Sequence, residues 1–273
     1  MSTHVIVVGA RGFVGGAIVA EARARGLAVL ERRTDDEAAG DADAAIVYAG
    51  GVASGAARDP QLAFRRHVGD AVRWAAVPHR SFVYLSSTRV YDGADATRED
   101  ARVRVLPGGS DPYVSSKVAG ECAVLAVSPR AFVARLSNVA GPSVRSELFL
   151  SDILRQAASE GIVRVRSALT SSKDYIDVRD VAAWTVDLAL TGGPRILNLA
   201  AGRNLAHGEL LGVLTRIAPV SVVVADASPE IVVTAIDAGL VQATFPRALR
   251  DPLAELPGYF KAFQAALPLA IGK

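Results

Sequence analysis

A tyrosine and a lysine stand four positions apart, Tyr113 and Lys117, in the stretch DPYVSSKVAGE, just after a proline that could open a helix. Residues i and i+4 of a helix share one face, so the phenol and the ammonium can address the same small volume. A neighbouring ammonium favours the phenolate, which makes the hydroxyl a usable proton donor near neutrality. Such pairs are common in helices, so proton transfer here is a hypothesis that needs further groups.

A third set of polar groups ends the apolar run SFVYLSST, at Ser86, Ser87 and Thr88. The carboxyl ends of parallel strands form the edge of a sheet where ligands bind, so a hydroxyl at this edge can reach a bound substrate. There it can hydrogen-bond a carbonyl oxygen as that oxygen gains charge. For Ser86 we expect a plainer role, satisfying backbone groups in the turn.

The elements that must position these groups are short apolar runs that alternate with helical patterns through the first two thirds of the chain. Runs such as AAIVYAGG, SFVYLSST and AFVARLSNV are apolar almost throughout. That pattern is typical of strands in a parallel sheet covered by helices on both faces. We therefore predict an α/β fold with a doubly wound parallel sheet. Further along, DYIDVRDVAAWTVDLALTGG predicts a turn into a helix.

A glycine-rich turn follows the first predicted strand, HVIVVGA, at Gly9, Gly12 and Gly15, and a helical pattern follows it. A tight turn needs a residue without Cβ, a pyrophosphate needs close backbone approach, and the helix must pack closely with its amides facing the phosphates. The spacing G-x-x-G-x-x-G differs by one residue from the commonest fingerprint. Its place between strand and helix predicts a dinucleotide site on a Rossmann sheet; a tight turn without a ligand is the alternative.

The end of the second predicted strand, LERRTDD, bears on which dinucleotide binds. Where an acidic residue would hold the ribose 2′-hydroxyl of NAD, the chain has Arg32 and Arg33. Guanidinium groups bind a 2′-phosphate well, and Arg11 in the glycine turn could reach the same group. We expect NADP, with NAD as the alternative, because nearby Glu31 and Asp35 leave open that these arginines are ordinary surface charges.

Composition excludes several classes of protein. With 51% hydrophobic residues, the 273-residue chain can build a large core. Its 30 basic and 28 acidic residues are scattered, which gives no footprint for nucleic acid. The single cysteine, Cys122, has no disulfide partner and no metal-ligand spacing around it, so we expect no metal and a cytoplasmic location. The sequence contains no apolar run of about 18 residues, so we expect no membrane span.

Together, the glycine turn, the strand-end serines and Y-x-x-x-K resemble the short-chain dehydrogenase/reductase family, specifically its extended branch of nucleotide-sugar epimerases, dehydratases and ketoreductases. The segments RLSNVAGP and KDYIDVRDVA are similar to the branch's later motifs. The resemblance implies that Ser87 is the catalytic hydroxyl, Tyr113 the proton donor or acceptor, and Lys117 the residue that binds the nicotinamide ribose and lowers the pKa of the phenol.

The same resemblance, with the glycine turn and the strand-end arginines, assigns residues to two further sites. The expected cofactor-binding residues are Gly9, Arg11, Gly12, Phe13, Gly15, Arg32, Arg33, Ala49, Gly50, Tyr113 and Lys117. The expected substrate-binding residues are Thr88, Asn138, Phe149 and Lys173. The dinucleotide-binding domain is expected over 1–141 with 177–202, and a smaller mixed α/β substrate-binding lobe over 142–176 with 203–273.

Departures from the family pattern narrow the expectation. Thr88 and Arg89 stand where 4,6-dehydratases carry an Asp-Glu pair, so dehydration lacks its acid and base. Lys173 replaces an arginine, a point charge in place of a bidentate fork, which weakens the expected grip on a nucleotide diphosphate. His67 stands where many members carry an asparagine of a proton relay, so that relay is in doubt.

The function expected from these residues is NADP(H)-dependent reduction of a keto group, and the substrate we expect first is a nucleotide sugar. Two alternatives stay open: a nucleotide-sugar epimerase with tightly bound NAD(P), and a non-catalytic protein that binds NADP as a sensor. We expect a small-molecule substrate and a homodimer formed through helices that include the one bearing Tyr113 and Lys117.

Overall fold

The computed structural model describes residues 4–52, 58–144, 146, 148–225, 229–231 and 233–271, with the backbone alone for 268–271. The chain divides into two compact units. Unit 1 comprises Met1–Ser137, Val178–Ala200 and Asp237–Arg247, and unit 2 comprises Asn138–Asp177, Ala201–Ile236 and Ala248–Lys273.

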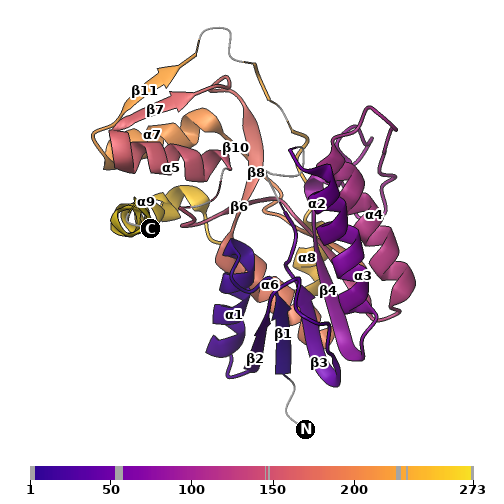
Figure 1. The fold of residues 1–273 in the computed structure, drawn as a ribbon. Helices are drawn as coiled ribbons and strands as arrows, with labels where there is room; N and C mark the ends of the chain where they lie inside the picture. Colours follow the sequence, from indigo (N-terminus) through magenta and orange to yellow (C-terminus); the bar gives the residue numbers. More distant parts are fainter. Residues whose placement is uncertain are drawn as a thin grey trace. The chain divides into compact units, whose positions relative to one another are not determined.

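Unit 1 contains the predicted doubly wound sheet, and this prediction of the fold class is confirmed. Six parallel strands lie in the order β2-β1-β3-β4-β5-β9. Figure 1 shows α1 and α6 on one side of the sheet and α2, α3 and α4 on the other. The strands are β1 (His4–Val8), β2 (Ala28–Arg32), β3 (Asp41–Tyr48), β4 (His79–Ser87), β5 (Ala131–Leu136) and β9 (Ile196–Leu199). The helices are α1 (Phe13–Ala24), α2 (Pro60–Phe64), α3 (Ala71–Ala75), α4 (Pro112–Val127), α6 (Val178–Thr191) and α8 (Gly239–Thr244).

The helix α4 begins where its sequence provides a cap. The carboxylate of Asp111 accepts the backbone N–H of Tyr113 at 2.8 Å, and Pro112 occupies the first helical position, where its missing N–H costs nothing. The cap fixes the first turn of the helix, which carries Tyr113. Lys117 follows one turn later on the same face.

Between α2 and α3 the chain forms a π-helical turn, η1 (Arg65–Asp70). Two buried tyrosines of neighbouring strands account for it. The hydroxyl of Tyr48 donates to the carbonyl of Arg66 at 2.6 Å, and that of Tyr84 donates to the carbonyl of His67 at 3.1 Å. These bonds compete for carbonyls that an α-helical ladder uses, and π turns of this kind often occur at functional sites.

Unit 2 consists of two small sheets with helices packed around a separate apolar core. One sheet has the order β10-β8-β6, from β6 (Asn138–Ala140), β8 (Ser172–Asp177) and β10 (Asn204–Ala206). The other pairs β7 (Ile162–Val165) with β11 (Ser221–Val224), and the helices are α5 (Phe149–Glu160), α7 (His207–Ile217) and α9 (Pro252–Ile271). The prediction of a turn at DYID was wrong, because these residues form β8, paired on both sides.

The segment Asp237–Arg247 belongs to unit 1, whereas the sequence placed it with the C-terminal lobe. Side chains of the sheet domain hold its backbone. Asn198 donates through Nδ2 to the carbonyl of Asp237 at 2.9 Å, and Trp184 donates through Nε1 to the carbonyl of Phe245 at 2.9 Å. These contacts join residues 39 and 61 positions apart, which local sequence patterns do not reveal.

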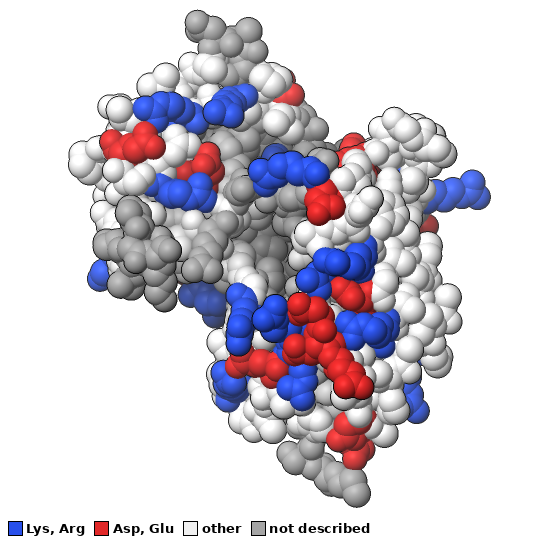
Figure 2. Space-filling model, viewed as in Figure 1, with Lys and Arg blue, Asp and Glu red and all other residues white. Residues whose placement is uncertain are grey.

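Basic and acidic side chains are interspersed on the face shown in Figure 2 and do not gather into a patch of one sign. Among the described residues, ion pairs join Arg23 with Glu31 and Arg25 with Glu21, both at 2.7 Å. In the part of the chain that the structure describes, no helix is long and apolar enough to cross a membrane.

The glycine turn between β1 and α1 is tightly built. Gly9 has φ +83°, a conformation that favours glycine, and its N–H donates to the carbonyl of Arg32 at 2.8 Å. A Cβ on Gly9 would lie 2.7 Å from the carbonyl oxygen of Ala49, and one on Gly15 would lie 2.2 Å from that of Gly9. The helix therefore packs on the turn as closely as the backbone allows.

A buried ion pair joins α4 to the sheet. Arg135 on β5 donates to the carboxylate of Glu121 on α4, with Nη2 2.7 Å from Oε2, and both side chains are only 4% exposed. Ser86, at the end of β4, donates to the same carboxylate at 2.5 Å. This differs from the expectation for Ser86, which was a bond to turn backbone. The carboxylate thus ties the helix bearing Tyr113 to the two strands beneath it.

The ion pair continues into a chain of hydrogen bonds. Arg135 donates through Nη1 to the hydroxyl of Tyr91, which donates to Oδ1 of Asn198 on β9, both at 2.8 Å. Tyr91 ends η2 (Thr88–Tyr91), the short 3₁₀ turn that directly follows Ser87. The carboxyl ends of β4, β5 and β9 are therefore fixed to one another and to α4.

Adjacent glycines of α1 provide a matched test of the turn. Gly15→Ala places a Cβ against the Gly9 carbonyl, so we expect it to lower the free energy of unfolding by about 1–3 kcal/mol. In Gly16→Ala the new Cβ lies 3.5 Å from the Ala10 carbonyl, an ordinary contact, so we expect no loss or a gain of about 0.5–1 kcal/mol from helix propensity. Urea unfolding monitored by circular dichroism measures both; equal effects would contradict this packing.

Buried serines at the ends of neighbouring strands provide a matched test of the carboxylate brace. Ser86→Ala removes a hydrogen bond to a charged group, so we expect a loss of about 1.5–3 kcal/mol in unfolding free energy. The Ser137 hydroxyl is buried without a hydrogen-bond partner among the described residues, so Ser137→Ala should lose no stability and should gain up to about 1–3 kcal/mol. The same urea experiment compares them, and a harmless Ser86→Ala would count against the brace.

Candidate active site

The structure brings together the three residues predicted to be catalytic. The hydroxyl of Tyr113 is hydrogen-bonded to that of Ser87. Lys117 donates through Nζ to the carbonyl of Leu85 at 2.8 Å, and this Nζ lies 5.9 Å from the centre of the Tyr113 ring. A strand-end hydroxyl, a phenol and an amine thus meet at the carboxyl end of β4, where the α/β fold binds ligands.

The charge nearest the phenol comes from a residue that sequence reasoning did not assign to the site. The guanidinium carbon of Arg89 lies 5.1 Å from the centre of the Tyr113 ring, and Arg89 is paired with Asp111 at 2.8 Å. Burial raises the pKa of Tyr113, while the hydrogen bond from Ser87 and the charge of Arg89 oppose that rise. The sequence signals for Arg89 were its place two residues after Ser87 and its position where 4,6-dehydratases carry the second residue of an Asp-Glu pair.

Lys117 is deeply buried, which sets its protonation. Burial lowers the pKa of its ammonium to about 7, while the carboxylate of Glu121, one turn later on α4, opposes that shift. Lys117 therefore changes its charge in the physiological range of pH. Sequence analysis missed Glu121, although its i+4 spacing from Lys117 is the signal that could have found it.

His67 holds a loop against this group. Its Nδ1 lies 2.8 Å from the Ser116 hydroxyl and its Nε2 lies 3.0 Å from the Val52 carbonyl. Burial, followed by the charge of Lys117, lowers the pKa of His67 to about 3, so the ring is neutral. With both nitrogens engaged, His67 anchors the segment after β3. Gly51 lies in that segment, where a Cβ would come within 2.9 Å of Lys117 Nζ.

The glycine turn fits the pyrophosphate of a dinucleotide. Helix α1 has Gly12 at its N-cap, which offers no side-chain cap, and no acidic residue in its first turn, which leaves the positive end of its dipole to an anionic group. Ala49 lies against Gly9, and Gly50 follows it, so the end of β3 lines the same turn. Arg11 is exposed and Phe13 is half-buried.

The two arginines at the end of β2 differ in their partners. Arg33 is paired with Asp35, with Nε 3.1 Å from Oδ1. Arg32 instead donates to the backbone carbonyl of Glu31 at 3.3 Å, and it has no carboxylate partner among the described residues. Of the pair, Arg32 is therefore the one whose charge is available to a phosphate.

The predicted substrate-binding residues lie in both units. Thr88 begins η2 in unit 1 and is 9% exposed. In unit 2, Asn138 donates through Nδ2 to the carbonyl of Asp174 at 2.9 Å, so its amide is already engaged. Phe149 and Lys173 line one hollow of about 510 Å³, which also includes three residues that sequence analysis missed. These are Arg164, Arg166 and His207. The alternation IVRVR, typical of a strand with one polar face, was the available signal for the two arginines.

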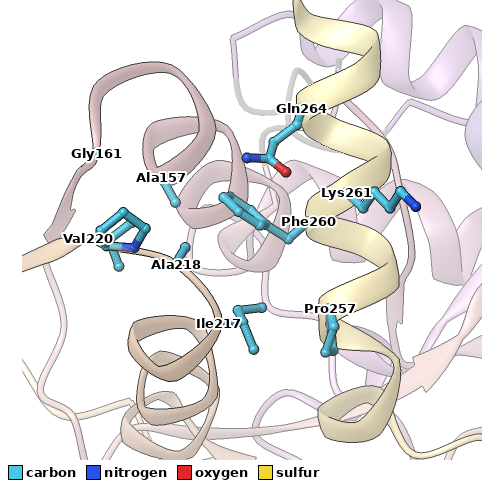
Figure 3. A pocket seen from close by; sticks show the side chains of 10 residues that line it. Ala157, Gly161, Ile217, Ala218, Val220, Pro257, Phe260, Lys261 and Gln264 are labelled. Carbon is cyan, nitrogen blue, oxygen red and sulfur yellow. The ribbon is translucent and has the colours of Figure 1, made fainter.

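A second hollow of unit 2, also about 510 Å³, is shown in Figure 3 between α5, the end of α7 and α9. Its lining is mostly apolar: the ring of Phe260 points toward it, and the side chain of Lys261 points away. No residue predicted to be catalytic or to bind cofactor or substrate lines it, so it is not a candidate for the chemistry.

Comparisons with known proteins show the family to which the chain belongs. The NAD dependent epimerase/dehydratase family matches residues 43–200. A GDP-6-deoxy-D-mannose reductase from Pseudomonas aeruginosa is 28% identical over 150 residues, which are 51% of this chain and 49% of the reductase. The matched part thus spans about half the length of that curated relative.

Solved structures show the same fold over nearly the whole chain. One is an NAD dependent NDP-hexosamine 5,6-dehydratase, TunA, of tunicamycin biosynthesis, with a TM-score of 0.83, 19% identity and coverage of 97% of this chain and 98% of that one. Another is RMD from Pseudomonas aeruginosa complexed with NADPH, with a TM-score of 0.79, 20% identity and coverage of 96% and 99%. Because the family match extends over more than half of the sequence, the chain belongs to the NAD dependent epimerase/dehydratase family, within the extended short-chain dehydrogenases/reductases.

Proposed function

We propose that the protein reduces a keto group of a nucleotide sugar with NADPH. The observation that carries the proposal is the meeting of Ser87, Tyr113 and Lys117 at the end of β4. A glycine turn suited to a dinucleotide lies in the same unit. The curated relative is named as a reductase of a GDP-sugar, which supports this reaction class.

In the proposed reaction the protein holds the carbonyl oxygen and supplies its proton. The nicotinamide, when bound, supplies the hydride. Ser87 and Tyr113 hydrogen-bond the oxygen as it gains charge, and Tyr113 then gives up its phenolic proton. Lys117, while charged, favours the resulting phenolate, and Arg89 adds a second positive charge at the same ring.

Side chains of unit 2 support a nucleotide diphosphate as part of the substrate. The hollow that contains Phe149 offers an aromatic surface for a base and three cationic side chains for phosphates. Lys173 is the cationic residue that the sequence predicted to bind substrate. Arg164 and Arg166 add two further positive charges to the same hollow. Arg164 is paired with Glu160, whereas no ion pair of Arg166 lies among the described residues.

NADP is the proposed cofactor because Arg32 has no carboxylate partner among the described residues, and because RMD, a structural neighbour, is described with NADPH. Other neighbours are described with NAD, so assays with NADPH and NADH side by side are the test. The cytoplasmic location and the homodimer stay predictions.

An epimerase is the second candidate, favoured by neighbours named as UDP-glucose and UDP-glucuronic acid 4-epimerases. Epimerisation oxidises and then reduces one carbon, so it consumes no reductant. Interconversion of epimers by the purified protein without added cofactor would overturn the reductase assignment. A sensor without catalysis, the third candidate, has no need for a buried lysine beside a phenol.

Replacing Tyr113 by Phe separates an enzyme from a sensor. The variant keeps the ring and loses the transferable proton, so we expect keto reduction to fall by at least about 100-fold, the usual range for a lost acid catalyst. The affinity for NADPH, measured by fluorescence titration, should stay within twofold. Undiminished turnover in this variant would remove Tyr113 from the mechanism.

The protonation of Lys117 predicts a pH dependence. Its pKa of about 7 means that the ammonium loses its proton as the pH rises through 7, and with it the charge proposed to bind the cofactor. We expect kcat/KM for NADPH, which reports groups of the free enzyme, to fall about tenfold per pH unit above 7. In Lys117→Arg, which stays charged, the decline should disappear, although the overall rate drops. A kcat/KM for NADPH that stays constant up to pH 9 in the natural protein would contradict this role of Lys117.

A further inference from the structure

His207 is a buried histidine of unit 2 with no part in the proposed catalysis. It is the first residue of α7, it is 1% exposed, and it lines the hollow that contains Phe149 and Lys173. Neither a family motif nor metal-ligand spacing accounts for a histidine here.

Two contacts fix the orientation of the imidazole, and a third holds the backbone that carries it. The backbone N–H of His207 donates to the carbonyl of Ser171 at 2.8 Å, and Nδ1 lies 2.8 Å from the hydroxyl of Ser167. The ring of Phe149 stacks on it, with centres 3.7 Å apart and planes inclined by 12°. A side chain held by a hydrogen bond and by ring stacking is preorganised for recognition.

The remaining polar atom of the ring is without a partner. Nε2 is buried and makes no hydrogen bond within the described part of the chain. Burial, followed by the charge of Lys173, lowers the pKa of His207 to about 4, so the ring is neutral near pH 7. An unsatisfied buried polar atom costs about 1–3 kcal/mol, and a bound molecule that bonds to Nε2 would recover it.

The surroundings indicate what kind of molecule that is. Phe149 and His207 lie nearly parallel, which presents planar ring faces at the hollow, and a nucleobase combines a planar ring with polar atoms on its edge. Phe149 begins α5, and its ring can make no hydrogen bond, so packing alone holds it, whereas the His207 ring is also bonded to Ser167.

We propose that His207 is a specificity residue that hydrogen-bonds the base of the bound nucleotide through Nε2, with the Phe149 ring shifting to stack on that base. This inference rests on the proposed function, since it assumes a nucleotide in the hollow of unit 2. It assigns the base to Phe149 and His207 and leaves the phosphates to the cationic side chains.

The test is calorimetric titration of the full chain with GDP and, separately, with UDP. His207→Phe keeps an aromatic ring on Phe149 and removes Nε2, so we expect at least tenfold weaker binding of whichever nucleotide the natural protein binds. His207→Gln, which offers an amide in place of the imidazole, should recover part of the loss. NADPH affinity should stay within twofold in both variants.

His79→Phe is the matched control. His79 is also a buried histidine bonded to a serine, but both its nitrogens are engaged, with the Val77 carbonyl at 2.7 Å and the Ser128 hydroxyl at 2.8 Å, and it does not line the hollow. Its replacement should lower the melting temperature without weakening GDP or UDP binding.

The outcomes separate the two proposals. If the natural protein binds neither nucleotide, the nucleotide-sugar assignment fails and this inference fails with it. If it binds one of them and His207→Phe binds equally well, the inference alone is overturned. Should His207→Phe lose NADPH binding through misfolding, Ser167→Ala, which frees the imidazole, decides instead: at least threefold weaker nucleotide binding supports the role, and unchanged binding refutes it.

Discussion

The carboxylate of Glu121 and the guanidinium of Arg135 form the interaction on which the candidate active site depends. Taking two charges out of water costs several kcal/mol each, and only close pairing with further hydrogen bonds offsets that cost. Here the carboxylate also accepts from Ser86, and the guanidinium also donates to Tyr91. Each member of the pair therefore has further hydrogen-bond partners, and the pair fixes α4, which carries Tyr113 and Lys117, to the strand ends beside Ser87.

The carboxylate of Glu121 also influences the protonation of Lys117. Glu121 follows Lys117 by one helical turn, and its negative charge opposes the effect of burial on the lysine pKa. Without that charge a buried ammonium would lose its proton at lower pH, and the phenol would lose its supporting cation. Arg89, held by Asp111 beside the Tyr113 ring, adds a charge from the exposed side. The charges around the Tyr113 ring and its lysine neighbour are thus two cations, Lys117 and Arg89, and two anions, Glu121 and Asp111.

Local sequence patterns predicted much of this site. The apolar runs predicted the sheet, and spacing alone put Tyr113 and Lys117 on one helical face. Features that depend on distant partners were not predicted. These are the pairing of Glu121 with Arg135 and the place of Asp237–Arg247 in unit 1. The π turn at His67 also escaped, because tyrosines of other strands cause it. In unit 2, β8 was taken for a turn because its charged residues hid a strand that is paired on both sides.

A double-mutant cycle on the buried pair tests the central claim most directly. Arg135→Met and Glu121→Leu each leave one charge buried without its partner, so each should lower the free energy of unfolding by about 3–5 kcal/mol. The double variant replaces both charges with apolar groups and should be more stable than the sum of the two losses predicts by at least about 2 kcal/mol. Additive losses, or single losses below about 1 kcal/mol, would show that the ion pair does not hold α4 to the sheet.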